Sequence, residues 1–146
     1  MPAKNKPETK PVETLKIPSD LKHIEKVEKF SQKICKKMGL SEEQSDNMAI
    51  ALTELAVNAM VHGNKEDPQK KVTIQADFEE DRLRVSITDE GGGFDPGDIP
   101  NPTNPQNLWK EHGRGIFLVQ NLIDEVSFST TPEGMKITLI EYRERS

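Results

Sequence analysis

Apolar residues recur at spacings of three, four and seven over residues 20–38, the pattern of one face of a helix. The segment is therefore predicted to form an amphipathic helix, with Ser19 or Asp20 as its N-cap and Gly39 at its end. Before it, alternating apolar and polar residues over 12–18 predict a short first strand. The apolar positions of the helix are Leu21, Ile24, Val27, Ile34 and Met38.

A second helix is predicted from the capping box formed by Ser41 and Gln44. It should begin near Glu42 and end at Gly63. Its second half, residues 49–64 (AIALTELAVNAMVHGN), is apolar around most of the circumference, so this helix is expected to be buried. The apolar positions are Ile50, Leu52, Leu55, Val57, Met60 and Val61.

Three polar residues interrupt this apolar stretch at a spacing of four: Glu54, Asn58 and His62. That spacing places them in one stripe along a helix. A carboxylate and an amide are costly to bury unless something pairs with them. Two interpretations are open at this point. The stripe is either a satisfied hydrogen-bond network in the core, or a polar face turned toward a bound ligand and a metal ion.

The second half of the chain begins with two alternating segments, residues 72–78 and 83–87, which predict a hairpin of two half-buried strands. Asp89 has the same parity as the apolar residues of the second strand, so its side chain is expected on the core face. Residues 94–107 are crowded with Pro, Asn, Asp and Gly. They predict a long irregular loop, and such loops in compact domains are usually functional.

The remaining elements are a helix over residues 116–123, a strand over 126–130, a turn at 132–134 and a last strand over 135–142. Helices cluster early and strands late, with one helix between two pairs of strands. This order is typical of an α+β fold. We therefore predict a two-layer α/β sandwich, with a mixed β-sheet and helices packed on one face.

The composition of the 146-residue chain suits one domain, expected over residues 12–146 after a disordered tail at 1–11. The net charge is −5 and the basic residues are dispersed, which argues against nucleic acid as the main partner. The single cysteine, Cys35, excludes an internal disulfide and favours a cytoplasmic location. Cys35 and His23 each stand alone and are interpreted as a packed thiol and a surface imidazole. No apolar run approaches the ~20 residues of a membrane span, and the N-terminus lacks a signal-peptide core.

Three polar residues suit nucleotide chemistry. An inward aspartate, as expected for Asp89, can accept a hydrogen bond from an exocyclic amine such as that of adenine. The amide oxygen of an asparagine such as Asn58 is a suitable hard ligand for Mg²⁺. A glutamate one turn away, Glu54, can position or deprotonate a nucleophile.

Two glycine clusters complete the set. Gly91 and Gly93 follow Asp89 and would let the backbone approach a base or a phosphate closely. The run Gly113-Arg114-Gly115 precedes a helix, whose N-terminus would offer N–H groups and its positive dipole end to phosphate. Neither cluster fits the P-loop or the Rossmann fingerprint. Taken alone, most of these glycines are explained by turns.

At these residues the sequence resembles the GHKL ATP-binding superfamily, which includes gyrase, heat-shock chaperone, histidine-kinase and mismatch-repair ATPases. The segment ELAVNAMVHGN at 54–64 looks like its N-box. DEGGGF at 89–94 looks like the D-x-G-x-G box, and HGRGI at 112–116 looks like the second glycine box. The order and the spacing match, and the resemblance covers about residues 15–142.

Within the superfamily, the chain resembles in particular the small bacterial anti-sigma factors that are also serine/threonine protein kinases. The grounds are the compact length, one helix before the N-box helix and a short lid. The resemblance implies that Glu54 is the catalytic base, Asn58 binds Mg²⁺ and Asp89 reads adenine. It also implies an ATP lid over about 94–112, and a packing role for His62. The further residues implied near the base or the phosphates are Gly91, Gly93, Gly113, Arg114 and Gly115.

The function implied by the resemblance is an ATP- and Mg²⁺-dependent kinase that phosphorylates a small antagonist protein and binds a sigma factor. A homodimer is usual in that family. The alternative is a non-catalytic switch, in which nucleotide only controls affinity for protein partners. Glu54 favours the kinase, because a pure binder has little need of a buried carboxylate beside a metal ligand. A sensor histidine kinase would need a helix pair with a phosphoacceptor histidine, and a gyrase-type ATPase a transducer domain; the sequence shows neither.

Overall fold

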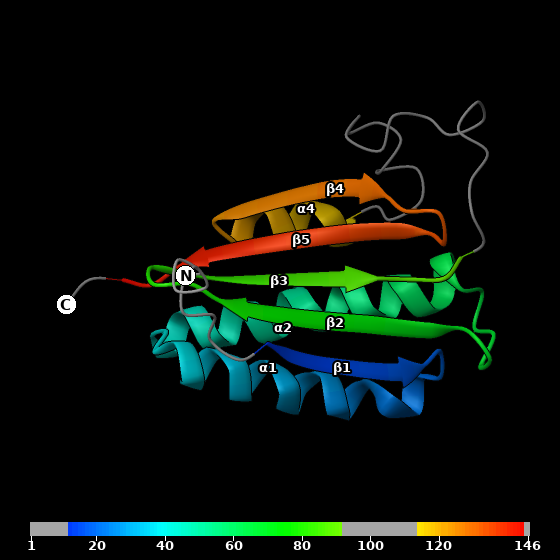
Figure 1. Ribbon diagram of the computed structural model, residues 1–146, viewed down its shortest axis with the longest axis horizontal. Helices are drawn as coiled ribbons and strands as arrows, with labels where there is room; N and C mark the ends of the chain where they lie inside the picture. Colours follow the sequence, from blue (N-terminus) through cyan, green and yellow to red (C-terminus); the bar gives the residue numbers. More distant parts are fainter. Residues whose placement is uncertain (1–11, 92–113, 145–146) are drawn as a thin grey trace, which may run out of the picture.

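The structure is a computed structural model that describes residues 12–91 and 114–144. In these residues three α-helices cover one face of a five-stranded sheet, which confirms the predicted two-layer α+β architecture (Figure 1). The predicted tail over 1–11 and the predicted lid over 94–112 lie outside the described residues.

The sheet differs from the prediction in its strand directions. Its strands are β1 (Glu13–Pro18), β2 (Lys71–Phe78), β3 (Arg82–Thr88), β4 (Glu125–Thr130) and β5 (Met135–Tyr142). Their order is β1-β2-β3-β5-β4, and all four neighbouring pairs are antiparallel, so the prediction of a mixed sheet was wrong. The crossover through a helix does leave β3 and β4 parallel to each other. They are not neighbours, however, because β5 folds back from β4 and lies between them.

The helical layer has α2 in its middle, in contact with both α1 and α4 (Figure 1). Gly39 ends the first helix as predicted, but Asp20 caps the short 3-10 turn η2, and α1 itself begins only at Ile24. Asp20 accepts a hydrogen bond from the backbone N–H of Lys22, and Gly39 ends α1 with a φ of +80°. The elements of this layer are η2 (Leu21–His23), α1 (Ile24–Met38), α2 (Glu42–Asn58), η3 (Ala59–Gly63) and α4 (Arg114–Leu122).

The capping box at the start of α2 is also confirmed. The backbone N–H of Gln44 donates to Oγ of Ser41 at 3.1 Å, and the backbone N–H of Ser41 donates to Oε1 of Gln44 at 3.0 Å. The far end of the predicted helix is different. After Asn58 the chain continues as the π-helical turn η3, which holds one residue more than an α-helical turn. His62, in this turn, is exposed, whereas Asn58 is buried.

The burial of α2 is narrower than predicted. Ile50 is 48% exposed, and Val57 and Val61 are only half-buried. The sheet covers one side of α2 and its two neighbouring helices cover the flanks, so the outer side of the helix faces solvent. The helix is therefore buried on its sheet side rather than around most of its circumference.

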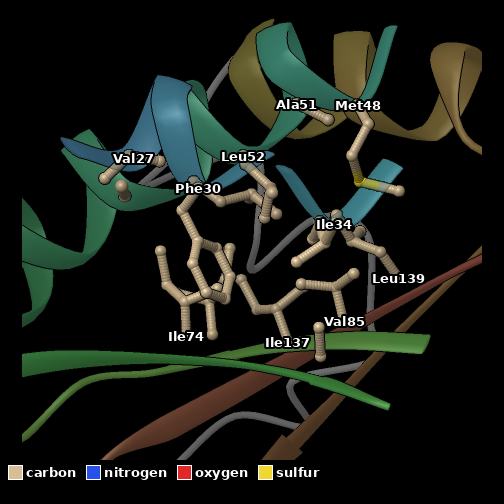
Figure 2. Packing of buried hydrophobic residues seen from close by; sticks show 14 of the residues in the cluster. Val27, Phe30, Ile34, Met48, Ala51, Leu52, Ile74, Val85, Ile137 and Leu139 are labelled. Atoms are coloured by element: carbon tan, nitrogen blue, oxygen red, sulfur yellow. The ribbon is translucent and has the colours of Figure 1, made fainter. Parts of the chain in front are cut away.

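The hydrophobic core fills the space between the two layers. Figure 2 shows Phe30 and Leu52 descending from the helices toward Ile74 on the sheet. Leu52 and Ile74 are fully buried, and burying a side chain of this size stabilises the fold by roughly 1.5–3 kcal/mol. This packing fixes α2 against the sheet, which places the polar residues of α2 at a defined position. The other core residues labelled in Figure 2 are Val27, Ile34, Met48, Ala51, Val85, Ile137 and Leu139.

Candidate nucleotide-binding site

Three of the predicted site residues line one pocket, between the end of α2, the end of β3 and the start of β5. They are Asn58, Asp89 and Gly91, which come from separate parts of the sequence. The pocket encloses about 150 Å³. Its remaining lining residues are Leu55, Ala59, His62, Gly63, Lys65, Ile87, Met135 and Ile137. The lining is thus largely apolar with a few polar groups, as is typical of small-molecule sites.

Asp89 is held firmly by the backbone around it. It is only 9% exposed, as its parity predicted. Its Oδ1 accepts hydrogen bonds from the backbone N–H of Gly91 at 3.0 Å and from that of Met135 at 3.1 Å. Its own backbone N–H donates to the carbonyl of Met135 at 3.1 Å, which extends the β3–β5 pairing by one residue. The orientation of the carboxylate is therefore set by the fold.

Glycines surround this carboxylate because no side chain would fit there. A Cβ at Gly63 would lie 2.3 Å from Oδ2 of Asp89. A Cβ at Gly134 would lie 2.2 Å from Oδ1 and 2.5 Å from the Asp89 carbonyl oxygen. A Cβ at Gly91 would lie 2.5 Å from the carbonyl oxygen of Gly63. Together Gly63, Gly91 and Gly134 form a cradle around Asp89.

Gly134 is a site residue that the sequence did not reveal. It was predicted only as part of a turn, and it does lie in one, where its carbonyl accepts a hydrogen bond from the backbone N–H of Thr131 at 2.7 Å. Its second role depends on the register of β5 against β3, which pairs Thr88 with Lys136 and so brings the turn beside Asp89. No local signal at Gly134 could have shown this contact.

Asn58 is the second polar group of the pocket. It is 6% exposed, and its Nδ2 has no hydrogen-bond partner in the described part of the chain. A buried polar atom without a partner requires an explanation. The amide nitrogen is a hydrogen-bond donor, so the partner that would satisfy it is an acceptor, such as a phosphate oxygen or a water molecule. Among the described residues, Asn58 is therefore not part of a satisfied hydrogen-bond network in the core. An amide of this kind, whose oxygen is a hard donor, fits the Mg²⁺ of a nucleotide.

Glu54 lies one turn before Asn58 on α2, and its side chain lines a neighbouring hollow. Gly115, Phe117, Leu118 and Asn121 of α4 line that hollow with it. Its side chain is half-buried and lies so close to α4 that a Cβ at Gly115 would be 2.2 Å from its Oε2. The stripe predicted on α2 is therefore divided, with Asn58 in the first pocket and Glu54 in the second.

Some predicted site residues cannot be placed. Gly93 and Gly113 lie outside the described residues, as does the side chain of Arg114. The backbone of α4 begins at Arg114, two residues earlier than the predicted start at 116, so Gly115 lies inside the first turn of the helix rather than before it. The contacts of Gly93, Gly113, Arg114 and Gly115 with a nucleotide stay predictions.

These features define a class of protein. A two-layer sandwich with a glycine-cradled aspartate, and an asparagine of the long helix lining the same pocket, is an ATP-binding domain of the GHKL type. The comparison with known families agrees: the chain belongs to the histidine kinase-like ATPase domain family, whose model matches residues 17–141. Membership implies ATP binding, typically with Mg²⁺.

Among curated proteins the chain is similar to serine-protein kinase RsbW from several Bacillus species. It is 27% identical to that of Bacillus cereus (strain ATCC 10987 / NRS 248) over 137 residues, which cover 90% of this chain and 84% of the relative. It is 28% identical to that of Bacillus subtilis (strain 168) over 134 residues, which cover 88% and 83%.

Two solved structures share the fold. The RsbU and RsbW domains of Rv1364c from Mycobacterium tuberculosis superpose with a TM-score of 0.68 at 16% identity. That match covers 94% of this chain and about a third (34%) of the other. The catalytic domain of histidine kinase ThkA gives a TM-score of 0.54 at 13% identity and covers 92% and 99%. No helix among the described residues is long and apolar enough to cross a bilayer.

Proposed function

We propose that the chain is an ATP-dependent serine/threonine protein kinase of the anti-sigma type, acting in the cytoplasm. It would phosphorylate a small antagonist protein and bind a sigma factor. The observation that carries the proposal is the placement of Glu54, which lies one turn from Asn58 yet opens into its own hollow beside the nucleotide pocket. A nucleotide and an acceptor hydroxyl could therefore approach the same helix from two sides. The similarity to RsbW, named a serine-protein kinase, supports this reading.

Asp89 and Asn58 would bind the nucleotide. Asp89 would accept a hydrogen bond from the exocyclic amine of adenine, because its fixed carboxylate faces the pocket. Asn58 would hold Mg²⁺ through its amide oxygen. When bound, the ion neutralises charge on the phosphates. Gly91 and Gly63 would allow close approach to the base, since any side chain there would fill the cradle.

The acceptor side belongs to Glu54. Phosphoryl transfer depends mostly on positioning and charge neutralisation, and the base orients the attacking hydroxyl. Glu54 would accept the proton of a serine or threonine hydroxyl as the oxygen forms its bond to the γ-phosphorus and the bond to ADP breaks. Its half-exposed position leaves room for a protein segment to reach it.

The test begins with pull-downs from the native host in ATP and in ADP, which supply the partner proteins. Each purified partner is then incubated with the chain and radiolabelled ATP, beside a nucleotide titration. We expect label on a serine or threonine of one partner. If the chain transfers no phosphate to any partner but binds one in a nucleotide-dependent way, the kinase proposal is wrong and the chain is a nucleotide-controlled switch.

A further inference from the structure

Asn64 is a buried amide that ties several elements together at the edge of the pocket. It follows η3 directly and is 1% exposed. Its Nδ2 donates to Oγ of Ser19 at 2.8 Å and to the carbonyl of Lys71 at 3.0 Å. Its Oδ1 accepts from the backbone N–H of Glu90 at 2.8 Å. One side chain thus bridges the end of β1, the start of β2 and the segment after β3.

The bond to Glu90 matters for the pocket because of where Glu90 lies in the chain. Its neighbours are Asp89 and Gly91, and both line the pocket. Glu90 is held a second time through its own side chain, since the backbone N–H of Lys71 donates to its Oε1 at 2.8 Å. These two bonds fix the backbone on which the Asp89 carboxylate is mounted.

The opposite wall of the pocket is fixed by the same residue. Asn64 follows Gly63, whose Cα lies against the Asp89 carboxylate, and its backbone N–H donates to the carbonyl of Ala59 at 2.8 Å. Asn64 is therefore bonded to η3 through its backbone and to the β3 end through its side chain. Asn64 is thus a direct link between the two walls of the pocket.

We propose that Asn64 is a positioning residue of the nucleotide site, which fixes the orientation of the Asp89 carboxylate relative to the base. The inference rests on the proposed role of Asp89 as the group that reads adenine. Binding groups must be held within about 0.5 Å of the productive geometry, so a small shift of the β3 end lowers both affinity and discrimination between bases. A merely structural role for Asn64 would lower stability and leave discrimination intact.

The test is the Asn64→Ala variant, titrated with MgADP and MgGDP by calorimetry. The variant loses all three side-chain hydrogen bonds and leaves the N–H of Glu90 without its acceptor. We expect MgADP affinity to fall roughly tenfold, and the preference for ADP over GDP to fall with it, the scale expected of a support whose loss loosens a site.

The matched control is Gln44→Ala, at the other end of the sheet. Gln44 is also a buried amide, 6% exposed, and its Nε2 donates to Oε2 of Glu141 at 3.1 Å and to the carbonyl of Tyr142 at 2.6 Å. This variant should lose comparable stability in urea, because it also breaks a buried hydrogen-bond network. Its MgADP affinity and its base preference should equal those of the wild type.

A second variant keeps the inference testable if Asn64→Ala does not fold. Glu90→Ala removes only the bond from Lys71 to a half-buried side chain, and we expect a smaller loss of affinity with the same loss of base preference. If wild type binds MgADP and both folded variants keep its base preference, the inference is wrong and the proposed function stands. If wild type binds neither nucleotide, the role of Asp89 fails and the inference fails with it.

Discussion

Asp89 and Glu54 are both carboxylates that lie against a glycine, yet they differ in burial and in hydrogen bonding. Asp89 is nearly buried, and two backbone N–H groups hold one of its oxygens. Glu54 is half-exposed on a helix, and within the described part of the chain its carboxylate makes no hydrogen bond. A group that recognises a base must be fixed before the base arrives. A group that takes a proton needs access to an incoming hydroxyl, and a longer side chain supplies it.

The glycines beside the two carboxylates show the same difference. A Cβ at Gly134 would meet the backbone oxygen of Asp89 as well as its side chain, and backbone cannot rotate away. The three atoms nearest to a Cβ at Gly115 would all belong to the side chain of Glu54, and the closest of them is Oε2. The surroundings of Asp89 are therefore rigid, whereas Glu54 can change rotamer to relieve a close contact.

The largest effect is expected from Glu54→Gln, which keeps the shape of the side chain and removes the proton acceptor. Phosphate transfer to the partner should fall roughly 10²-fold or more, the usual scale for loss of a general base. Nucleotide affinity should be unchanged, because Glu54 does not line the pocket of Asp89. Radiolabel transfer and calorimetry measure the two quantities. Transfer at the wild-type rate would show that Glu54 is not the base.

The second largest effect is expected from Asp89→Asn, which replaces an acceptor oxygen by a donor facing the adenine amine. The lost hydrogen bond and the unpaired buried group should cost on the order of 2–4 kcal/mol of nucleotide binding. That corresponds to a loss of affinity of roughly 30- to 900-fold. Calorimetry with MgATP measures it, and circular dichroism controls for folding. An unchanged affinity in the folded variant would contradict the role of Asp89.

A smaller effect is expected from two glycine substitutions, Gly134→Ala and Gly115→Ala, which should differ in whether nucleotide affinity or phosphate transfer is lowered more. The first must displace the backbone at Asp89, so MgADP affinity should fall roughly tenfold, as for other displaced supports of a site. The second should slow transfer roughly tenfold, since it displaces the catalytic group. It should lower affinity less than the first does, because the nearest atoms that its Cβ would meet belong to the movable side chain of Glu54. Titration and transfer assays on both variants check this. Equal effects of the two variants on affinity would refute the proposed division of roles.

The smallest effect concerns a third carboxylate, Glu141, which is buried away from the pocket. Burial raises its pKa above the ordinary 4.5, although the backbone N–H of Asp124 and the amide of Gln44 oppose the shift. The folded chain therefore binds this proton more tightly than the unfolded chain. Protonation of Glu141 should therefore increase the free energy of unfolding as the pH falls through the raised pKa toward 4.5. This stabilisation should be lost as the pH rises again through the raised pKa.

Urea unfolding of wild type and Glu141→Gln over this pH range measures the effect, because the difference between the two isolates one carboxylate. MgADP affinity measured on the variant at a single pH should equal that of the wild type. A difference in stability that does not vary with pH would contradict the raised pKa.

Local patterns in the sequence predicted a large part of the fold. Alternation gave the hairpin of β2 and β3, and parity placed Asp89 on the core face, because strand side chains alternate strictly. The capping box placed the start of α2. The convergence of Asn58, Asp89 and Gly91 on one pocket followed from the resemblance to a family rather than from local pattern.

The errors arose where distant segments decide the outcome. The position of β5 between β3 and β4 depends on pairing that no single segment encodes, and it made the sheet antiparallel throughout. Ile50 looked like a core residue because the pattern of α2 does not show which of its apolar sides the sheet covers. The contact of Gly134 with Asp89 exists only once β5 is in register with β3.

The π-helical turn at Ala59–Gly63 has a consequence for alignments of the family. The backbone N–H of Asn64 bonds to the carbonyl of Ala59, five residues back rather than four, so this turn holds one residue more than an α-helical turn. In a structural superposition, a helix that is regular at this point would follow this chain as far as Asn58 and would be out of register with it by one residue at Asn64. Glu54 and Asn58 would therefore superpose with the regular helix, whereas Asn64 would not.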